Sequence, residues 1–250
     1  MLEPVMQFAF NLALGTVLGA LGGLFGIGGA LIAIPVLSKV YGMEQHLAQG
    51  TALLMIAPNA LIGFLRYRQK NAIEIKSTFW LCLLVMPSAA VGAHVAANFP
   101  ATLLRQMFAA FLILLVLYFF FQQRTARDKA PLLGPRSMPL IGILSGAVSG
   151  FFTVGGGLVA VPVLVGAYSV SQTKAQGLAL AMVIPGSLVA LVTYAQAGHV
   201  DWPVGLPIAL GGLVSVSWGV ELAHRIAPRR LRLAFCAMLA AIALAMLAWR

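Results

Sequence analysis

The sequence predicts an all-α polytopic membrane protein built from two inverted-topology repeats. Three observations carry this prediction: the hydropathy of the whole chain, an internal duplication, and the distribution of charge between the loops. Of the 250 residues, 61% are hydrophobic and 9% are charged, and the mean hydropathy is +0.97. This composition leaves too little polar surface to cover a soluble globule, so most of the chain is expected to lie in a bilayer.

Eight apolar segments follow one another along the chain. They cover residues 5–40, 46–65, 77–97, 103–121, 138–168, 174–194, 202–223 and 231–249. Most are close to the ~20 residues that cross a bilayer as a helix. The first and fifth segments, at 36 and 31 residues, are each too long for one comfortable span and short for two. Each could be a tilted, kinked helix or a hairpin that turns inside the membrane at its glycines.

These two long segments are copies of each other. Residues 22–37 read GGLFGIGGALIAIPVL, and residues 149–164, 127 positions later, read SGFFTVGGGLVAVPVL. Across residues 23–61, 19 of the 39 positions aligned at this offset are identical without a gap. A shared apolar composition alone would give roughly one identity in ten. The chain is therefore an internal duplication.

Loop charge indicates how the two repeats are oriented. Lys and Arg near helix ends accumulate on the cytoplasmic side. Eight single spans would leave no bias, whereas two hairpins with an outer N-terminus place 13 of the 16 Lys and Arg residues inside. Both termini are then expected on the outer, periplasmic side. Each repeat becomes a glycine-turned broken-helix hairpin followed by three transmembrane helices. The predicted parts are a first repeat (1–121), a basic cytoplasmic linker (122–136) and a second repeat (137–250).

The hairpin motifs resemble those of a known family. GIGGALIAIP and VGGGLVAVP, each followed about twenty residues on by AQG, are similar to the TauE/SafE family of sulfite and organosulfonate exporters, also called the toluenesulfonate uptake permease family. The resemblance implies secondary transport of small sulfur-containing anions. Sulfite, sulfoacetate, thiosulfate and related organosulfonates are the implied substrates, and the bacterial cytoplasmic (inner) membrane is the implied location.

The hairpin glycines are the first candidates for a substrate site. A helix that begins inside the membrane presents free N–H groups and the positive end of its dipole, which can hold an anion without a buried cation. Gly28 and Gly29 precede one such start, and Gly155, Gly156 and Gly157 precede the other. In an inverted arrangement both starts can meet near the midplane around one substrate. Alternatively, the small residues only allow close helix packing.

Neutral polar side chains are the second set of candidates. Gln49 and Gln176 are equivalent amides that could donate hydrogen bonds to an oxyanion or cap hairpin carbonyls. Thr51, Asn59 and Thr153 differ from their counterparts in the other repeat, so any polar lining they supply is asymmetric. The prolines expected to kink helices next to the site are Pro35, Pro58, Pro162 and Pro185.

Other functional classes have less support. An intramembrane enzyme would need paired Asp, Ser with His, or HExxH at membrane depth, and the sequence offers none of these. The 4 His and 10 Met are dispersed, so no metal site or cofactor is expected. The net charge of +10 reflects topology and anionic membrane lipids rather than a nucleic-acid partner. A passive anion channel stays an alternative, and both a proton and a sodium ion stay candidates for the coupling ion.

Overall fold

The computed structural model describes residues 2–121, 137–152 and 157–248, and these residues form helices and short connections without strands. The helices are α1 (Leu2–Phe25), α2 (Ala30–Tyr41), α3 (Gln45–Lys70), α4 (Ile75–Ala97), α5 (Ala101–Phe121), α6 (Met138–Phe152), α7 (Gly157–Ala167), α8 (Gln172–Gln196), α9 (Trp202–Arg225) and α10 (Pro228–Ala248). Within the described ranges, α1, α3, α4, α5, α8 and α9 are long and apolar enough to cross a membrane. The predicted all-helical membrane architecture is confirmed.

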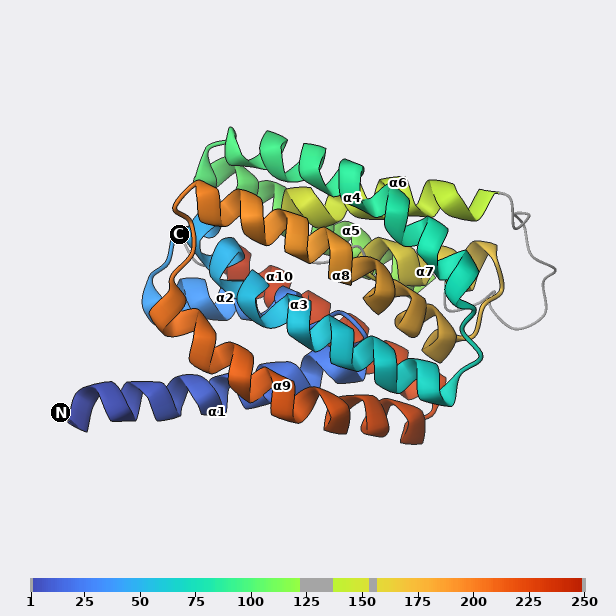
Figure 1. Cartoon of the computed structure of the whole chain (residues 1–250), viewed down its shortest axis with the longest axis horizontal. Helices are drawn as coiled ribbons and strands as arrows, with labels where there is room; N and C mark the ends of the chain where they lie inside the picture. Colours follow the sequence, from blue (N-terminus) through green and yellow to red (C-terminus); the bar gives the residue numbers. More distant parts are fainter. Residues whose placement is uncertain (1, 122–136, 153–156, 249–250) are drawn as a thin grey trace.

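The first long segment breaks at its glycine cluster. α1 ends at Phe25 and α2 begins at Ala30, and Gly26, Gly28 and Gly29 between them have φ values of 68°, 70° and 94°. These left-handed values favour glycine, since a side chain would crowd the backbone there. The two limbs are unequal, because α1 has 24 residues and α2 has 12. The first turns of α1 project beyond the rest of the bundle (Figure 1).

The second long segment is broken at the corresponding place. Its limbs are α6, with 15 residues, and α7, with 11 residues. The predicted site residues Thr153, Gly155 and Gly156 lie between them, outside the described residues. In Figure 1, α6 and α7 enter the bundle from the end opposite to α1 and α2.

The helix connections gather at two ends of the bundle (Figure 1). We call one the terminal end, because α1 begins there, α10 ends there, and it holds the connections 42–44, 98–100 and 197–201. The other is the linker end, where α5 ends, α6 begins, and the connections 71–74, 168–171 and 226–227 lie. The two hairpins thus point at each other from opposite ends.

The two repeats are interlocked through their first helices. α1 packs along α9 and α6 packs along α4, while α3 and α8 pack against each other in the middle. Glycines make both long contacts close. The contacts in α1 and α9 are Gly15 on Ile208, Gly19 on Gly212 and Gly23 on Val216, and those in α6 and α4 are Gly142 on Leu81, Gly146 on Val85 and Gly150 on Ala89. Glycine at every fourth position therefore gives each hairpin a flat face that lies on a helix of the other repeat.

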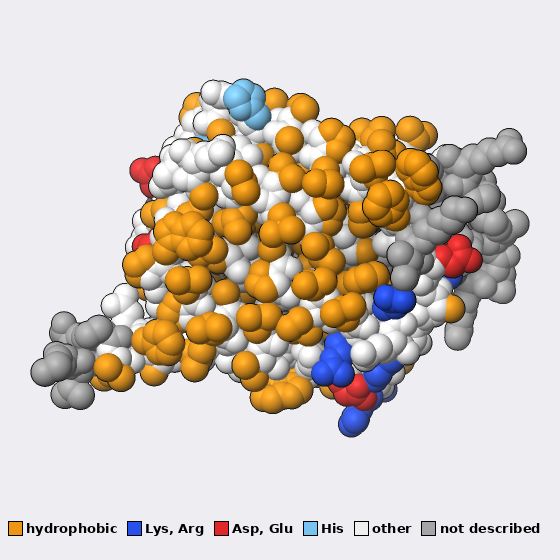
Figure 2. Space-filling model, in the orientation of Figure 1, with side chains coloured by type: hydrophobic (Ala, Val, Ile, Leu, Met, Phe, Trp, Pro, Cys, Tyr) orange, Lys and Arg blue, Asp and Glu red, His pale blue; other side chains and the backbone are white. Residues whose placement is uncertain are grey.

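Charge is confined to the ends of the molecule. Figure 2 shows hydrophobic side chains over the middle of the visible face, and Lys and Arg together near the linker end. There Lys70 and Arg225 both pair with Glu221. Among the described residues no Lys, Arg, Asp or Glu is buried. An apolar belt between polar ends matches the profile of a bilayer.

Cysteine labelling tests which end faces the cytoplasm. In a protein whose native Cys82 and Cys236 are replaced by serine, we expect Lys70→Cys to resist a membrane-impermeant maleimide in intact cells and Asn98→Cys to react. The reason is that Lys70 ends α3 at the linker end, whereas Asn98 follows α4 at the terminal end, and basic ends stay in the cytoplasm. Reaction of both positions from outside would contradict the inverted arrangement. Permeabilised cells, in which both must react, are the control.

Candidate functional site

The turn of the first hairpin lies between the two central helices. A methyl group on Gly28 would be 3.3 Å from Cγ2 of Ile56 in α3 and 3.8 Å from Cγ1 of Val183 in α8. Ile56 and Val183 are equivalent positions, 127 residues apart. Gly29, at the start of α2, has Cε of Met55 2.7 Å from where its Cβ would be. The glycines therefore place the start of α2 where the two repeats meet.

The start of the second hairpin's returning limb reaches the same place. A Cβ on Gly157, the first residue of α7, would lie 3.3 Å from Cβ of Ala179 and 3.3 Å from the carbonyl oxygen of Gly26. The same Cβ would lie 3.8 Å from Cγ2 of Val183. Of the predicted glycines, Gly28, Gly29 and Gly157 are therefore brought together. The starts of α2 and α7 therefore lie near one another, and the first amides of a helix generally have no partner within it.

Gln176 of α8 holds the end of the first broken helix. Its Nε2 donates to the carbonyl oxygen of Phe25, the last residue of α1, at 3.2 Å. The hydroxyl of Tyr67 in α3 lies 3.1 Å from both Oε1 of Gln176 and the carbonyl oxygen of Gly23. Gly26 permits this approach, because a Cβ there would lie 2.6 Å from Cβ of Gln176. The amide thus satisfies a carbonyl that the helix leaves open.

Gln49 of α3 makes the equivalent contacts with the second broken helix. Its Nε2 donates to the carbonyl oxygen of Phe152, the last residue of α6, at 3.4 Å. Tyr194 of α8 donates to its Oε1 at 2.8 Å. Each glutamine therefore caps the hairpin of the opposite repeat, which was one of the two roles expected for these amides. Each NH₂ group has a second hydrogen that this contact does not use.

Tyr67 and Tyr194 were missed by the sequence reasoning. They are fully enclosed side chains, and they fix the orientation of both glutamines. The signal was present, because the two tyrosines are also 127 positions apart. Both rings contact histidines: Tyr67 lies 5.0 Å from His224 between ring centroids, and Tyr194 lies 6.4 Å from His199.

The histidines near Tyr194 form a pair at the terminal end. The rings of His46 and His199 stack with centroids 5.2 Å apart. Nε2 of His46 lies 3.1 Å from the carbonyl oxygen of Phe99, and its Nδ1 is buried without a partner among the described residues. Burial, and then the nearby His46, lower the pKa of His199, while the carboxylate of Glu44 acts in the opposite direction. At neutral pH the surroundings of His199, in the connection 197–201, therefore favour its neutral form.

Two other predicted residues contact α9 or the connection before it. The hydroxyl of Thr51 accepts from the backbone N–H of Asp201 at 2.9 Å, and so holds the connection before α9. Asn59 is fully buried, with Nδ2 2.5 Å from where a Cβ of Gly212 would be. Both its polar side-chain atoms are without a hydrogen-bond partner in the described part of the chain.

Comparison with known proteins identifies the family. The family model described as "Sulfite exporter TauE/SafE" matches residues 11–246. The chain belongs to the TauE/SafE family. A probable membrane transporter protein of Methanocaldococcus jannaschii is 27% identical over 97% of this chain and 98% of its own length. Similar proteins with the same kind of name occur in Xylella fastidiosa, at 26% identity over 88% of this chain and 87% of the relative, and in Bacillus subtilis (YunE), at 25% over 82% and 85%. The chain is a membrane transporter.

Prolines interrupt the helices of this TauE/SafE transporter around the site. Pro35, Pro58, Pro162 and Pro185 lie inside α2, α3, α7 and α8. Each removes the N–H that would bond the carbonyl four residues earlier. For Pro185 that carbonyl is on Ala181, and Sγ of Cys82 in α4 donates to it at 3.2 Å. This contact gives Cys82 a structural role.

The buried polar side chains described for this TauE/SafE protein include no Lys, Arg, Asp or Glu. Within the described residues the buried polar side chains are Asn11, Gln45, His46, Gln49, Thr51, Asn59, Thr78, Ser145, Ser149, Gln176, Ser187 and Ser215. Amides, hydroxyls and backbone N–H groups can donate to an oxyanion, and no Lys or Arg among the described residues is buried. The described residues also contain no cluster of His, Cys, Asp and Glu that could hold a metal ion.

Proposed function

We propose that this protein is a secondary transporter that moves small sulfur-containing anions across the bacterial cytoplasmic membrane by alternating access around a midplane site. Sulfite, sulfoacetate, thiosulfate and related organosulfonates form the substrate class. The observation that carries the proposal is the meeting of the two glycine-broken helices between α3 and α8. Hairpins that enter from opposite ends and meet halfway are the arrangement in which such transporters hold their substrate.

Helix starts supply the attraction for an anion. The amides that begin α2 and α7 carry the positive ends of two helix dipoles, each of which favours a nearby negative charge by about 1 to 2 kcal/mol when partly buried. The glycines at these starts leave the amides open to a ligand. Gln49 and Gln176 each retain a free N–H next to the same turns. Together these groups favour a compact oxyanion over a cation or a neutral molecule of the same shape.

Transport by purified protein in liposomes distinguishes a carrier from a channel. Labelled sulfite is supplied with or without an imposed proton or sodium gradient. A carrier accumulates the anion above its outside concentration under one of the gradients, and that gradient names the coupling ion. Equilibration without accumulation under every gradient would instead favour the passive anion channel. Liposomes without protein give the background.

Heat stability gives an independent test of the substrate class. Sulfite, thiosulfate or a small sulfonate should raise the unfolding temperature in detergent, because a ligand at a hundred times its Kd stabilises the folded state by about 2.7 kcal/mol. Intrinsic tryptophan fluorescence follows the transition. Chloride at equal ionic strength and the neutral solute dimethyl sulfone are the controls. Stabilisation by a divalent metal or a neutral solute, and by none of the sulfur anions, would show that the anion class is wrong.

A further inference from the structure

We propose that Gln172 and Gln45 line the two mouths of the transport path, and that in this structure the mouth at Gln172 is the more accessible of the two while the mouth at Gln45 is closed. This inference rests on the proposed alternating-access function and adds to it two residues that contact the passing anion. It also assigns the conformation that is seen. Four observations carry it: a pocket, its repeat-related counterpart, an unpaired buried amide and an aromatic cluster.

A small pocket adjoins the hairpins on the side of the linker end. Gly157 and Gln176 form its inner wall, next to the turn of the first hairpin. Gln172, Leu231 and Phe235 form its outer wall. Gln172 is the first residue of α8, one helical turn before Gln176, and its side chain is partly exposed. The pocket therefore lies between the hairpins and the linker end, with room for about one water molecule.

The same four side chains recur at the opposite end. An offset of 127 residues relates Gln172, Gln176, Leu231 and Phe235 to Gln45, Gln49, Leu104 and Phe108, which are identical in type. Gln45 begins α3 at the terminal end. The three inner members are buried at both ends, with exposed fractions of 2%, 2% and 7% for Gln176, Leu231 and Phe235 and zero for their counterparts. The outer glutamine differs, since Gln45 is 4% exposed and Gln172 is partly exposed. One wall is thus present twice, with its outer glutamine accessible at the linker end and buried at the terminal end.

The closed copy contains an amide that lacks a partner. Nε2 of Gln45 is buried and makes no hydrogen bond with any described residue. An unpaired buried donor is unfavourable, because it has given up its hydrogen bonds to water without gaining another. That cost ends if the mouth opens, because the amide can then donate to water or to an oxyanion oxygen. Gln172 is in that accessible environment already. The two glutamines therefore differ by the state of the path and not by their chemistry.

An aromatic cluster closes the terminal end. At the linker end Phe25 contacts Phe235, with ring centroids 5.3 Å apart. The equivalent contact at the terminal end is Phe152 with Phe108, at 5.6 Å. Phe152 there also contacts two additional rings.

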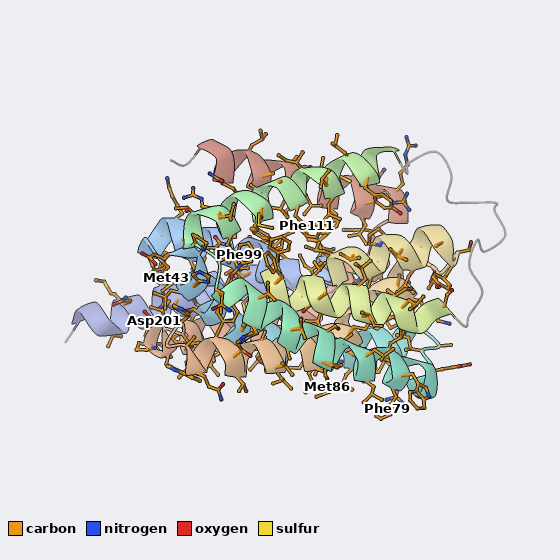
Figure 3. All side chains as sticks on the ribbon, turned by 90° about the horizontal axis from the view of Figure 1, so that it is seen from above. Met43, Phe79, Met86, Phe99, Phe111 and Asp201 are labelled. Atoms are coloured by element: carbon orange, nitrogen blue, oxygen red, sulfur yellow. The ribbon has the colours of Figure 1, made fainter. Side chains whose placement is uncertain are left out.

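The two additional rings are Phe111 at 5.0 Å and Phe151 at 4.9 Å, and Phe151 contacts Phe99 at 5.6 Å. Figure 3 shows Phe99 near the end that holds Met43 and Asp201, with Phe111 farther in. The positions equivalent to Phe111 and Phe151 at the linker end are Met238 and Leu24. The extra phenylalanines thus favour closure at the terminal end.

Alkylation rates of single cysteines test the two mouths without any substrate. In the Cys82→Ser and Cys236→Ser background, purified Gln172→Cys should react with N-ethylmaleimide at least about tenfold faster than Gln45→Cys, because the buried thiol reacts only after the mouth opens. Gln106→Cys, on the exposed surface of α5, is the control for reagent and protein. Equal rates at positions 45 and 172 would overturn the assignment of a more accessible mouth at Gln172 and a closed mouth at Gln45.

A second substitution tests whether the two mouths exclude each other. Phe111→Ala removes one ring contact of Phe152, and should raise the rate at Gln45→Cys and lower that at Gln172→Cys by about two- to tenfold. A rise at both positions would indicate a pore open at both ends and would overturn the inference.

Uptake separates this inference from the proposed function. Gln45→Ala and Gln172→Ala should each raise the KM for labelled sulfite, and Gln106→Ala should leave it unchanged. Sulfite uptake with an unaltered KM in both variants would mean that neither amide contacts the passing anion. If the wild type takes up no sulfur anion but the alkylation rates differ as expected, the proposed substrate class is wrong. The assignment of the two mouths is then retained.

Discussion

Replacing Gly28 by valine is expected to abolish transport while the protein still inserts into the membrane. Gly28 has φ 70°, a conformation in which a β-branched residue costs about 1–3 kcal/mol. The new side chain would also press on Ile56, whose Cγ2 is 3.3 Å from the position of the Cβ. The turn must then shift, and the valine covers the amides that begin α2. Uptake of labelled sulfite into liposomes should fall to the level of protein-free vesicles.

Gly42 provides a matched control for that experiment. It has φ 65°, close to the value at Gly28, but no atom lies within 4 Å of where its Cβ would be. Gly42→Val therefore carries the same kind of backbone strain at the other end of α2, away from the hairpin turn. We expect it to keep most of the wild-type uptake at equal protein amount. Normal uptake by Gly28→Val would mean that the hairpin glycines serve only close helix packing.

The helices themselves could be predicted because hydropathy and glycine act locally. Runs of about twenty apolar residues become helices in a bilayer, since no other partner satisfies the backbone. The break at Gly26–Gly29 was predicted for the same reason, because these residues interrupt an apolar run that is too long for one span. The length of α1 was not predicted. Its 24 residues make it a helix of spanning length, so the hairpin has one long limb and one short limb.

Contacts between the repeats could not be predicted from the sequence pattern. A buried glutamine can face a substrate or a backbone carbonyl, and its spacing is the same in both cases. Only the fold shows that Gln176 reaches Phe25 and Gln49 reaches Phe152, more than 100 positions away. Thr51 illustrates the converse, since it was a candidate for an asymmetric polar lining, while its hydroxyl accepts from the backbone N–H of Asp201. The duplication contained more information than was used, because it also pairs the two tyrosines.

The second large effect is expected when Gln176 is replaced by leucine. Leucine is close to glutamine in size but cannot donate to the carbonyl of Phe25, which then lies buried at the end of α1 without its partner. Leaving such a group unpaired costs about 1–3 kcal/mol, enough to release the hairpin turn from α8 in a large share of molecules. We expect sulfite uptake to fall by about tenfold or more, since 1.4 kcal/mol corresponds to a factor of ten.

A double-mutant cycle with Tyr67→Phe shows whether the amide of Gln176 acts together with the Tyr67 hydroxyl to hold the hairpin. The hydroxyl of Tyr67 lies 3.1 Å from Oε1 of Gln176 and holds the amide in place. If the two residues work as one unit, Tyr67→Phe should lower uptake in the wild type and change little in Gln176→Leu, so their effects are not additive. Gln196→Leu, at the exposed end of the same helix, is the control and should transport normally. Fully additive losses would mean that the tyrosine and the glutamine act separately, and that the amide contacts the substrate without help from the ring.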